Sequence, residues 1–369
     1  MLWNLVLLAF ASYVVVVVGS GLRWDRYDWR CSLQTARRAA PFVLFVWLAY
    51  WGWQSIAGTF SDYPNHLDTL GVDGRLYYRA AATWLAGGDP WTAYTTTNTW
   101  PPSGGMVHFL FTGPPPTVLA FAPFAWIPET PFVIGWFVVS VAAAVYTLRR
   151  LQLPVWWILC PPMMQGLLVA NPQVVCLALL LAGSDWLRAL AAPMKAYAVI
   201  PMVGLRQWRA LAILTIAVGA SVVIFWPLWA HYAADFRGTS SWLIGATNGG
   251  WSASRDLQLW AVAAILLVIL AAMNWRDAGW LAVPTLWPAA EFFYATFALP
   301  LRSPWLIAAL AMSNRADFPR ESEILVAYIA IRVARGAMER LWRQPLAQQL
   351  GARYLPQLAA RAGDPVVAE

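Results

Sequence analysis

The chain has 369 residues, of which 60% are hydrophobic and 12% are charged, and its mean hydropathy is +0.54. These values exclude an ordinary soluble domain and indicate a polytopic membrane protein. We attribute the formal net charge of +7 to arginines that face anionic lipid, rather than to a nucleic-acid surface. The three cysteines, Cys31, Cys160 and Cys176, show neither a disulfide pattern nor a metal-binding spacing.

The first apolar run, residues 2–18, has no basic segment before it and no small-residue cleavage site after it. We therefore expect an additional N-terminal transmembrane helix over residues 1–20, rather than a signal peptide. The segment from Arg23 to Arg38 holds five arginines and is predicted to be cytoplasmic.

Further apolar runs between residues 21 and 312 are candidate membrane spans. They cover residues 42–53, 117–127, 132–146, 155–168, 174–181, 191–205, 211–229, 259–275, 280–287 and 292–312. Several are shorter than the ~20 residues that a straight span needs, and prolines interrupt them. Either these helices stop partway through the bilayer or re-enter it around an internal cavity, or the prolines are simply those common in membrane helices. The predicted fold is an all-α polytopic membrane protein with about 9–12 transmembrane helices.

Charge placement orients this predicted bundle, since short arginine-rich loops stay on the cytoplasmic side. The loops 55–116 and 231–256 are predicted to be external. The tail, residues 313–369, is predicted to be cytoplasmic, with an amphipathic helix over 321–342 along the inner membrane face. Counting the crossings places Arg149 and Arg150 outside, which conflicts with the charge rule.

The most informative stretch is residues 73–91, DGRLYYRAAATWLAGGDPW, in the first predicted external loop. A loop of this length usually has a function or carries helices of its own. The spacing predicts a helix over Leu76–Leu85, ended by Gly87 and Pro90, on or just above the membrane surface. Asp73 precedes its first turn and is a candidate catalytic carboxylate, with helix capping as the alternative role.

Several motifs follow one another in order between about residue 60 and about residue 304. They are Asp73 with Tyr77-Tyr78, Ala80, Leu85, Gly87, Asp89 and Pro90; Phe111 with Pro114-Pro115, Pro123 and Pro128; Asn171-Pro172-Gln173; Pro193 with Lys195; and Arg206 with Arg209. This set resembles the integral-membrane GT-C glycosyltransferases, and within them the polyprenol-phosphate-mannose-dependent mannosyltransferases of glycosyltransferase family 87. The chain departs from that pattern with Trp91 and Gly113 in place of tyrosines, and a histidine of a late family motif has no counterpart near Glu291.

The resemblance implies a GT-C-like bundle over residues 21–312 in the cell membrane, with its active site on the external, periplasmic side. It implies inverting transfer of a hexose, with mannose favoured, from a polyprenyl phosphate donor to a glycolipid, a lipid-linked glycan or a protein. Asp73 is then the base that accepts the proton of the acceptor hydroxyl, and Asp62 is the second choice. No cofactor is expected, and no metal is expected because Asp73-Gly74-Arg75 departs from a DxD pair.

The remaining candidates divide between the donor phosphate and the substrate. The donor-phosphate candidates are Lys195, which is the only lysine, Arg75, Arg79 and His108. The substrate-binding candidates are Tyr77, Tyr78, Asp89, Asn171, Gln173, Glu291, His66 and His231. Structural alternatives stay open: snorkelling of Lys195 to the interface, pairing of the arginines with Asp68 or Asp73, capping by Glu291, and incidental placement of the histidines.

A membrane transporter or a flippase for lipid-linked sugars is the alternative function, because such proteins also contain broken helices and buried charges. A non-catalytic scaffold subunit is the third class. Transporters usually place their polar residues within the spans, whereas here they are concentrated in one predicted external loop. That distribution favours the enzyme, with membrane lipids as further partners and no nucleic acid.

Overall fold

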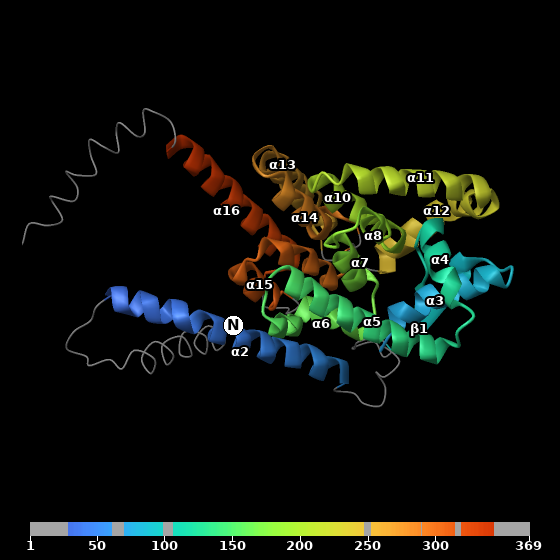
Figure 1. The fold of residues 1–369 in the computed structure, drawn as a ribbon, viewed down its shortest axis with the longest axis horizontal. Helices are drawn as coiled ribbons and strands as arrows, with labels where there is room; N and C mark the ends of the chain where they lie inside the picture. Colours follow the sequence, from blue (N-terminus) through green and yellow to red (C-terminus); the bar gives the residue numbers. More distant parts are fainter. Residues whose placement is uncertain are drawn as a thin grey trace, which may run out of the picture.

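The computed structural model describes residues 29–60, 70–98, 106–246, 252–288, 290–313 and 319–342. The predicted N-terminal helix over residues 1–20, and with it Asp62, His66 and Asp68, lie outside the described residues. The described part is mainly helical (Figure 1), which confirms the all-α class, with one addition. Strands β1 (Tyr94–Asn98) and β2 (Met106–Leu110) form an antiparallel hairpin that the sequence reading did not predict.

The helices are numerous and many are short. The α-helices are α2 (Trp29–Phe60), α3 (Val72–Leu85), α4 (Pro115–Phe121), α5 (Glu129–Arg150), α6 (Pro161–Leu168), α7 (Gln173–Leu180), α8 (Asp185–Ala189), α9 (Ala191–Met194), α10 (Val199–Gly204), α11 (Trp208–Ile224), α12 (Trp226–Ala246), α13 (Leu257–Met273), α14 (Trp275–Leu286), α15 (Pro304–Leu310) and α16 (Glu321–Trp342). The 3₁₀ helices are η2 (Pro90–Thr92), η3 (Ala122–Phe124), η4 (Val155–Leu159), η5 (Ala196–Ala198), η6 (Ala253–Arg255) and η7 (Phe292–Leu301).

Membrane-spanning length is found in few of these helices. Within the described ranges, α5 alone is long and apolar enough to cross a bilayer, and the total rises to three if each of two bent pairs is one span. The pair α6 and α7 bends by 116°, and α11 and the start of α12 bend by 97°. The broader prediction of about 9–12 transmembrane helices is therefore still only a prediction.

Several of the predicted apolar runs are not continuous α-helices. Residues 117–127 fall into the short α4 and η3, and residues 191–205 divide into α9, η5 and α10. Prolines lie at or near these divisions. Since proline lacks the N–H that a continuing helix requires, it favours a break in the helix there. The crossing count assumed a span at 117–127, where the structure has only the short α4 and η3.

Helix α5 extends from α3 to the end of α7. Glu129 begins it and pairs with Arg79 of α3, whereas Arg150 ends it and donates to the Leu181 carbonyl at 3.3 Å. At 1.5 Å per residue its 22 residues measure about 33 Å. Arg149 and Arg150 therefore lie at the end of α5 opposite α3. The orientation in the membrane is still a prediction.

The two other predicted surface segments differ from the expectation in different ways. Helix α12 extends to Ala246, so the loop predicted over residues 231–256 is largely helical. Helix α16 has the predicted bounds, but it packs on α13, α14 and α15 (Figure 1) and buries Leu325 and Ile329. Arg332 of α16 also pairs with Asp277 of α14. One face of α16 thus belongs to the protein core.

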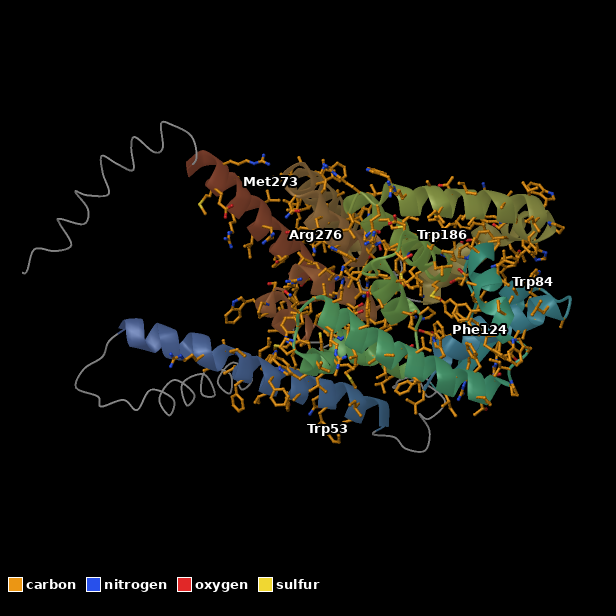
Figure 2. The ribbon with its side chains drawn as sticks, in the orientation of Figure 1. Trp53, Trp84, Phe124, Trp186, Met273 and Arg276 are labelled. Carbon is orange, nitrogen blue, oxygen red and sulfur yellow. The ribbon has the colours of Figure 1, made fainter. Side chains whose placement is uncertain are left out.

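Large apolar side chains are exposed on several helices. On α5, Ile134 and Val138 are 62% and 61% exposed, and on α11 Val223 is 80% exposed. Trp53 of α2 lies on the outer side of the molecule in Figure 2 and is 63% exposed. Soluble monomers rarely expose contiguous apolar patches of large size, so these faces indicate contact with lipid or with another protein.

Candidate functional site

Helix α3 begins earlier than predicted, and its start excludes capping by Asp73. The N-cap residue is Gly71, whose φ of 71° lies in the left-handed region, and no side chain caps the helix. Asp73 lies inside the first turn. Its backbone N–H and that of Gly71 donate to the carbonyls of Val169 and Leu168, at 3.0 and 2.9 Å. The end of α6 therefore satisfies the first amides of α3, and the Asp73 carboxylate is left for another partner.

That partner lies at the break between α6 and α7. Ala170 has a φ of 52°, and Asn171 follows it as a buried residue. The Asn171 Oδ1 accepts from the Gln173 backbone N–H at 2.9 Å and so supplies a hydrogen-bond acceptor at the start of α7. Its Nδ2 donates to the Asp73 Oδ2 at 2.6 Å. With both ends of its amide engaged, Asn171 holds the Asp73 carboxylate in a defined orientation.

Lys195 reaches the same place from a second break, between α9 and η5. Its Nζ lies over the ring of Tyr77, 5.1 Å from the centroid, and over the ring of Tyr294 at 5.7 Å. Tyr77 is one turn along α3 from Asp73, on the same face of the helix. Both rings belong to buried residues, so Lys195 points into this cluster and does not snorkel to an outer surface.

A hydroxyl and amide network surrounds the cluster. The fully buried Gln173 donates through Nε2 to the Thr296 Oγ1 at 2.9 Å, and the Tyr197 hydroxyl donates to the Gln173 Oε1. The Tyr197 and Tyr294 rings lie 4.6 Å apart. The sequence reading missed Tyr197, Tyr294 and Thr296 because all three lie in apolar runs. The available signal was the presence of hydroxyl groups in segments that were otherwise apolar.

The charges in this cluster influence one another. Burial raises the pKa of the Asp73 carboxyl, while the positive charge of Lys195 and the Asn171 hydrogen bond act against that rise. Glu291, in the link between α14 and η7, has its pKa raised to about 7 by burial and by the negative charge of Asp73, with Lys195 opposing. Asp73, Lys195 and Glu291 are all partly buried and keep some accessible surface. They form one electrostatically coupled group with access to solvent.

Arg75 and Arg79 do not belong to this group. Relative to Asp73 they lie about 200° and 240° around α3, and so on the other side of the helix. Arg79 binds Glu129 through two hydrogen bonds, of 3.0 and 2.9 Å, and the Arg75 Nε is 3.9 Å from the same carboxylate. Glu129, and not Asp73, is therefore their partner. The Tyr78 hydroxyl also holds this side of α3 by donating to the Ile127 carbonyl at 2.7 Å.

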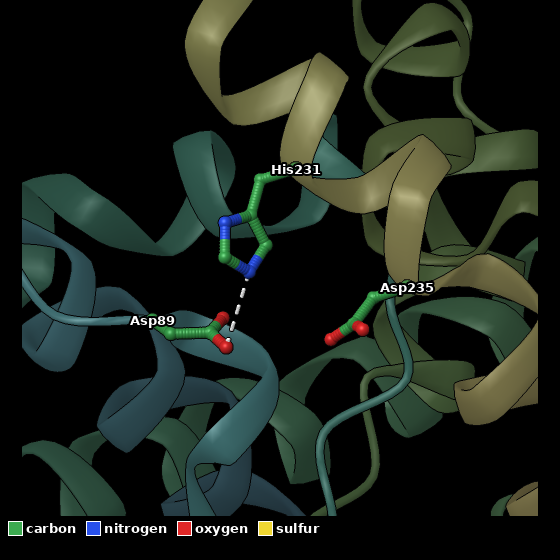
Figure 3. Close-up of side chains that lie close together, drawn as sticks. All are labelled: Asp89, His231 and Asp235. Carbon is green, nitrogen blue, oxygen red and sulfur yellow. Dashed lines mark ion pairs between the residues drawn. The ribbon is translucent and has the colours of Figure 1, made fainter.

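Asp89 and His231 form a separate pair (Figure 3). The Asp89 Oδ2 is 3.2 Å from the His231 Nε2 of α12, and its Oδ1 accepts from the Trp91 N–H at 2.9 Å. His108 pairs with Thr96 in the β1–β2 ladder, and its side chain lies outside the described part. The predicted site residues thus divide into Asp73, Tyr77, Asn171, Gln173, Lys195 and Glu291 in one cluster, and Asp89 and His231 in another.

Comparisons of this chain with protein-family models, with curated proteins and with solved structures find no match. The functional argument therefore depends on the geometry of these two clusters.

Proposed function

We propose that this protein is a membrane glycosyltransferase that moves a hexose from a polyprenyl phosphate to an acceptor hydroxyl. One observation carries the proposal: a carboxylate oriented by Asn171 lies in the same accessible cluster as the only lysine of the chain. Sugar transfer with inversion needs a base for the acceptor and a cation for the departing phosphate. Asp73 and Lys195 supply these two groups.

The reaction balances with these residues alone. The acceptor oxygen forms a bond to the anomeric carbon as its proton passes to the Asp73 carboxylate. The bond between the anomeric carbon and the phosphate oxygen breaks, and the phosphate keeps the electron pair. Lys195 stabilises that departing negative charge. The Tyr77 ring, one turn along α3 from Asp73, lies under the Lys195 Nζ at 5.1 Å and helps to hold that cation in place.

The depth of the cluster fits a donor carried by lipid. The Trp136 Nε1 donates to the Ala170 carbonyl at 3.0 Å, which places the break beside α5 at residue 136. From Glu129 to Trp136 the helix rises about 10 Å. If α5 crosses the bilayer, Asp73 lies below the level of the Arg79–Glu129 pair, on the membrane side. The proposal thus replaces a helix on the membrane surface with one whose first turn enters the membrane.

Transport of a lipid-linked sugar is the second candidate, and the 116° bend between α6 and α7 favours it. Bent half-helices with polar residues at the break are typical of transporter binding sites. A transporter, however, needs no base to accept a proton, so Asp73→Asn would still move the intact lipid-linked sugar across the membrane. The two candidates therefore differ in the chemistry expected at Asp73.

The test uses sealed membrane vesicles that contain the full chain and a polyprenyl phosphate carrying radiolabelled mannose. Label is measured in the lipid extract, in the delipidated residue and in the soluble fraction, so that any acceptor class is detected. We expect transfer by the wild type and a loss of about 100-fold or more in Asp73→Asn. Asp185→Asn is the matched control, since it changes a carboxylate that is ion-paired to Arg188 at 2.8 Å in another part of the fold.

Equal transfer by the wild type and Asp73→Asn would remove Asp73 from the reaction. Movement of intact labelled donor across the vesicle membrane, without transfer to any fraction, would instead support transport. Thermal unfolding of each variant in detergent shows whether a loss of transfer reflects a loss of folded protein.

A further inference from the structure

A second group of potential ligands lies apart from the proposed catalytic cluster. Asp89 follows α3 in the turn that leads to η2, while His231 and Asp235 lie on α12 (Figure 3). One ligand atom from each of the three residues lies within 4.8 Å of the others. The group thus joins segments far apart in the chain.

The spacing of these residues suits a metal ion. His231 and Asp235 are four residues apart, so their side chains lie on one face of α12, one turn from each other. Two ligands at about 2 Å from a tetrahedral Zn²⁺ are about 3.3 Å apart. The His231 Nε2 and the Asp89 Oδ2 are 3.2 Å apart. An oxygen of Asp235 lies within 4.8 Å of both of these atoms.

The surroundings of Asp89 and His231 orient them for this role. The Asp89 Oδ1 is occupied by the Trp91 backbone N–H, which leaves the Oδ2 on the side of His231. The His231 imidazole stacks on the Trp91 ring, with centroids 5.6 Å apart and planes 14° apart. Metal ligands are commonly fixed by such outer contacts. His231 and Asp235 are exposed, so a hydrated ion can reach the group from solvent.

We propose that Asp89, His231 and Asp235 bind one divalent cation of the Zn²⁺ type, which clamps α12 to the turn after α3. One imidazole and two carboxylates are ligands that Zn²⁺ accepts, with water in the fourth position. Mg²⁺ and Ca²⁺ prefer oxygen ligands and are less suited to this group, because His231 supplies a nitrogen ligand. The clamp is structural and does not depend on the proposed sugar transfer.

The competing interpretation is an ordinary ion pair between Asp89 and His231 at an exposed surface. Metal binding differs from it in requiring Asp235 and in having a fixed stoichiometry. The full chain is purified in nanodiscs, stripped with a chelator and titrated with ZnCl₂ by competition against a chromophoric chelator, with MgCl₂ as the comparison ion.

We expect one Zn²⁺ per wild-type chain and an affinity at least about 10-fold lower in Asp235→Asn and in His231→Ala. Glu339→Gln is the matched control, an exposed carboxylate on α16 that pairs with Arg335, and we expect it to bind as the wild type does. Saturating Zn²⁺ should also slow hydrogen exchange over residues 226–246 in the wild type and the control only.

The proposal is overturned if the wild type binds no stoichiometric Zn²⁺, or if Asp235→Asn and His231→Ala bind it as tightly as the wild type. Equal unfolding temperatures of all variants in chelator establish that the comparison is made between folded proteins. Because the readout is metal binding, a failure here leaves the proposed transfer reaction to its own test.

Discussion

Asn171 makes two hydrogen bonds with different roles, and two substitutions separate them. Its Oδ1 accepts from the Gln173 N–H at the start of α7, and its Nδ2 donates to the Asp73 carboxylate. Asn171→Ala removes both bonds. Asn171→Asp keeps an oxygen for the Gln173 N–H but replaces the donor that faces Asp73 with a second carboxylate.

The structure sets the size of each effect. The bond at the start of α7 is worth about 1 kcal/mol, and the bond to the Asp73 carboxylate about 1.5–3 kcal/mol. Asn171→Ala should therefore lower the free energy of unfolding by about 3 kcal/mol. Asn171→Asp places two carboxyl groups at hydrogen-bond distance, where they share a proton near neutral pH. The pKa of the pair then rises above that of Asp73 alone.

The assay is the pH dependence of hexose transfer between pH 5 and 9, with thermal unfolding of each variant measured in parallel. A base acts only when it is deprotonated, so a raised pKa moves the acid limb of the profile to higher pH. We expect Asn171→Asp to be nearly inactive at neutral pH and to recover as the pH rises. A profile identical to that of the wild type would refute the assignment of the proton acceptor to Asp73.

Three further predictions test other parts of the structure. Burial holds the pKa of the Glu291 carboxyl at about 7 in the folded protein, against 4.5 for the free group, so the native state binds a proton that the unfolded state has lost; the free energy of unfolding should therefore fall by about 3 kcal/mol between pH 4.5 and 7. Glu291→Gln should flatten this fall in unfolding measurements over that pH range. An unchanged slope would contradict the burial of the carboxyl. A Cβ on Gly204 would lie 2.5 Å from the Gly279 Cα, so Gly204→Ala should separate α10 from α14 and lower the free energy of unfolding by about 1–3 kcal/mol. A Cβ on Gly219 would have no atom within 4 Å, so Gly219→Ala should leave the free energy of unfolding unchanged in the same assay. Arg79→Ala should reduce stability by at most about 1 kcal/mol and leave the KM for the donor unchanged, and a raised KM at unchanged stability would show that Arg79 binds the phosphate.

Local signals in the sequence predicted local structure well. The glycines and proline after Leu85 correctly ended α3, and the amphipathic pattern gave α16 its observed bounds. The partners of charged residues were harder to predict, because they depend on packing between distant segments. Arg75 and Arg79 were predicted to bind the donor phosphate, with Asp68 or Asp73 as the alternative partner. In the structure Glu129 meets them across the contact of α3 with α5.

Apolar runs were the main source of error in the predicted fold. Hydropathy shows where a segment is apolar but not where its backbone hydrogen bonds end. The carbonyls of Leu168 and Val169, at the end of α6, accept hydrogen bonds from the first amides of α3. These partners are too far apart in the chain for a hydropathy window to include both. The same limit hid the break after Met194. Short helices at these points are stable because other segments satisfy their ends.

Three polar residues of the cluster around Asp73 lie at helix starts. Asp73 lies in the first turn of α3, Asn171 precedes α7 and Glu291 precedes η7. With Glu291 protonated, the charges of Lys195 and Asp73 neutralise each other. A phosphate that enters and engages Lys195 weakens the one positive charge that holds the pKa of Asp73 down. Binding of the donor would therefore make Asp73 a stronger base at the moment when the acceptor proton must be removed.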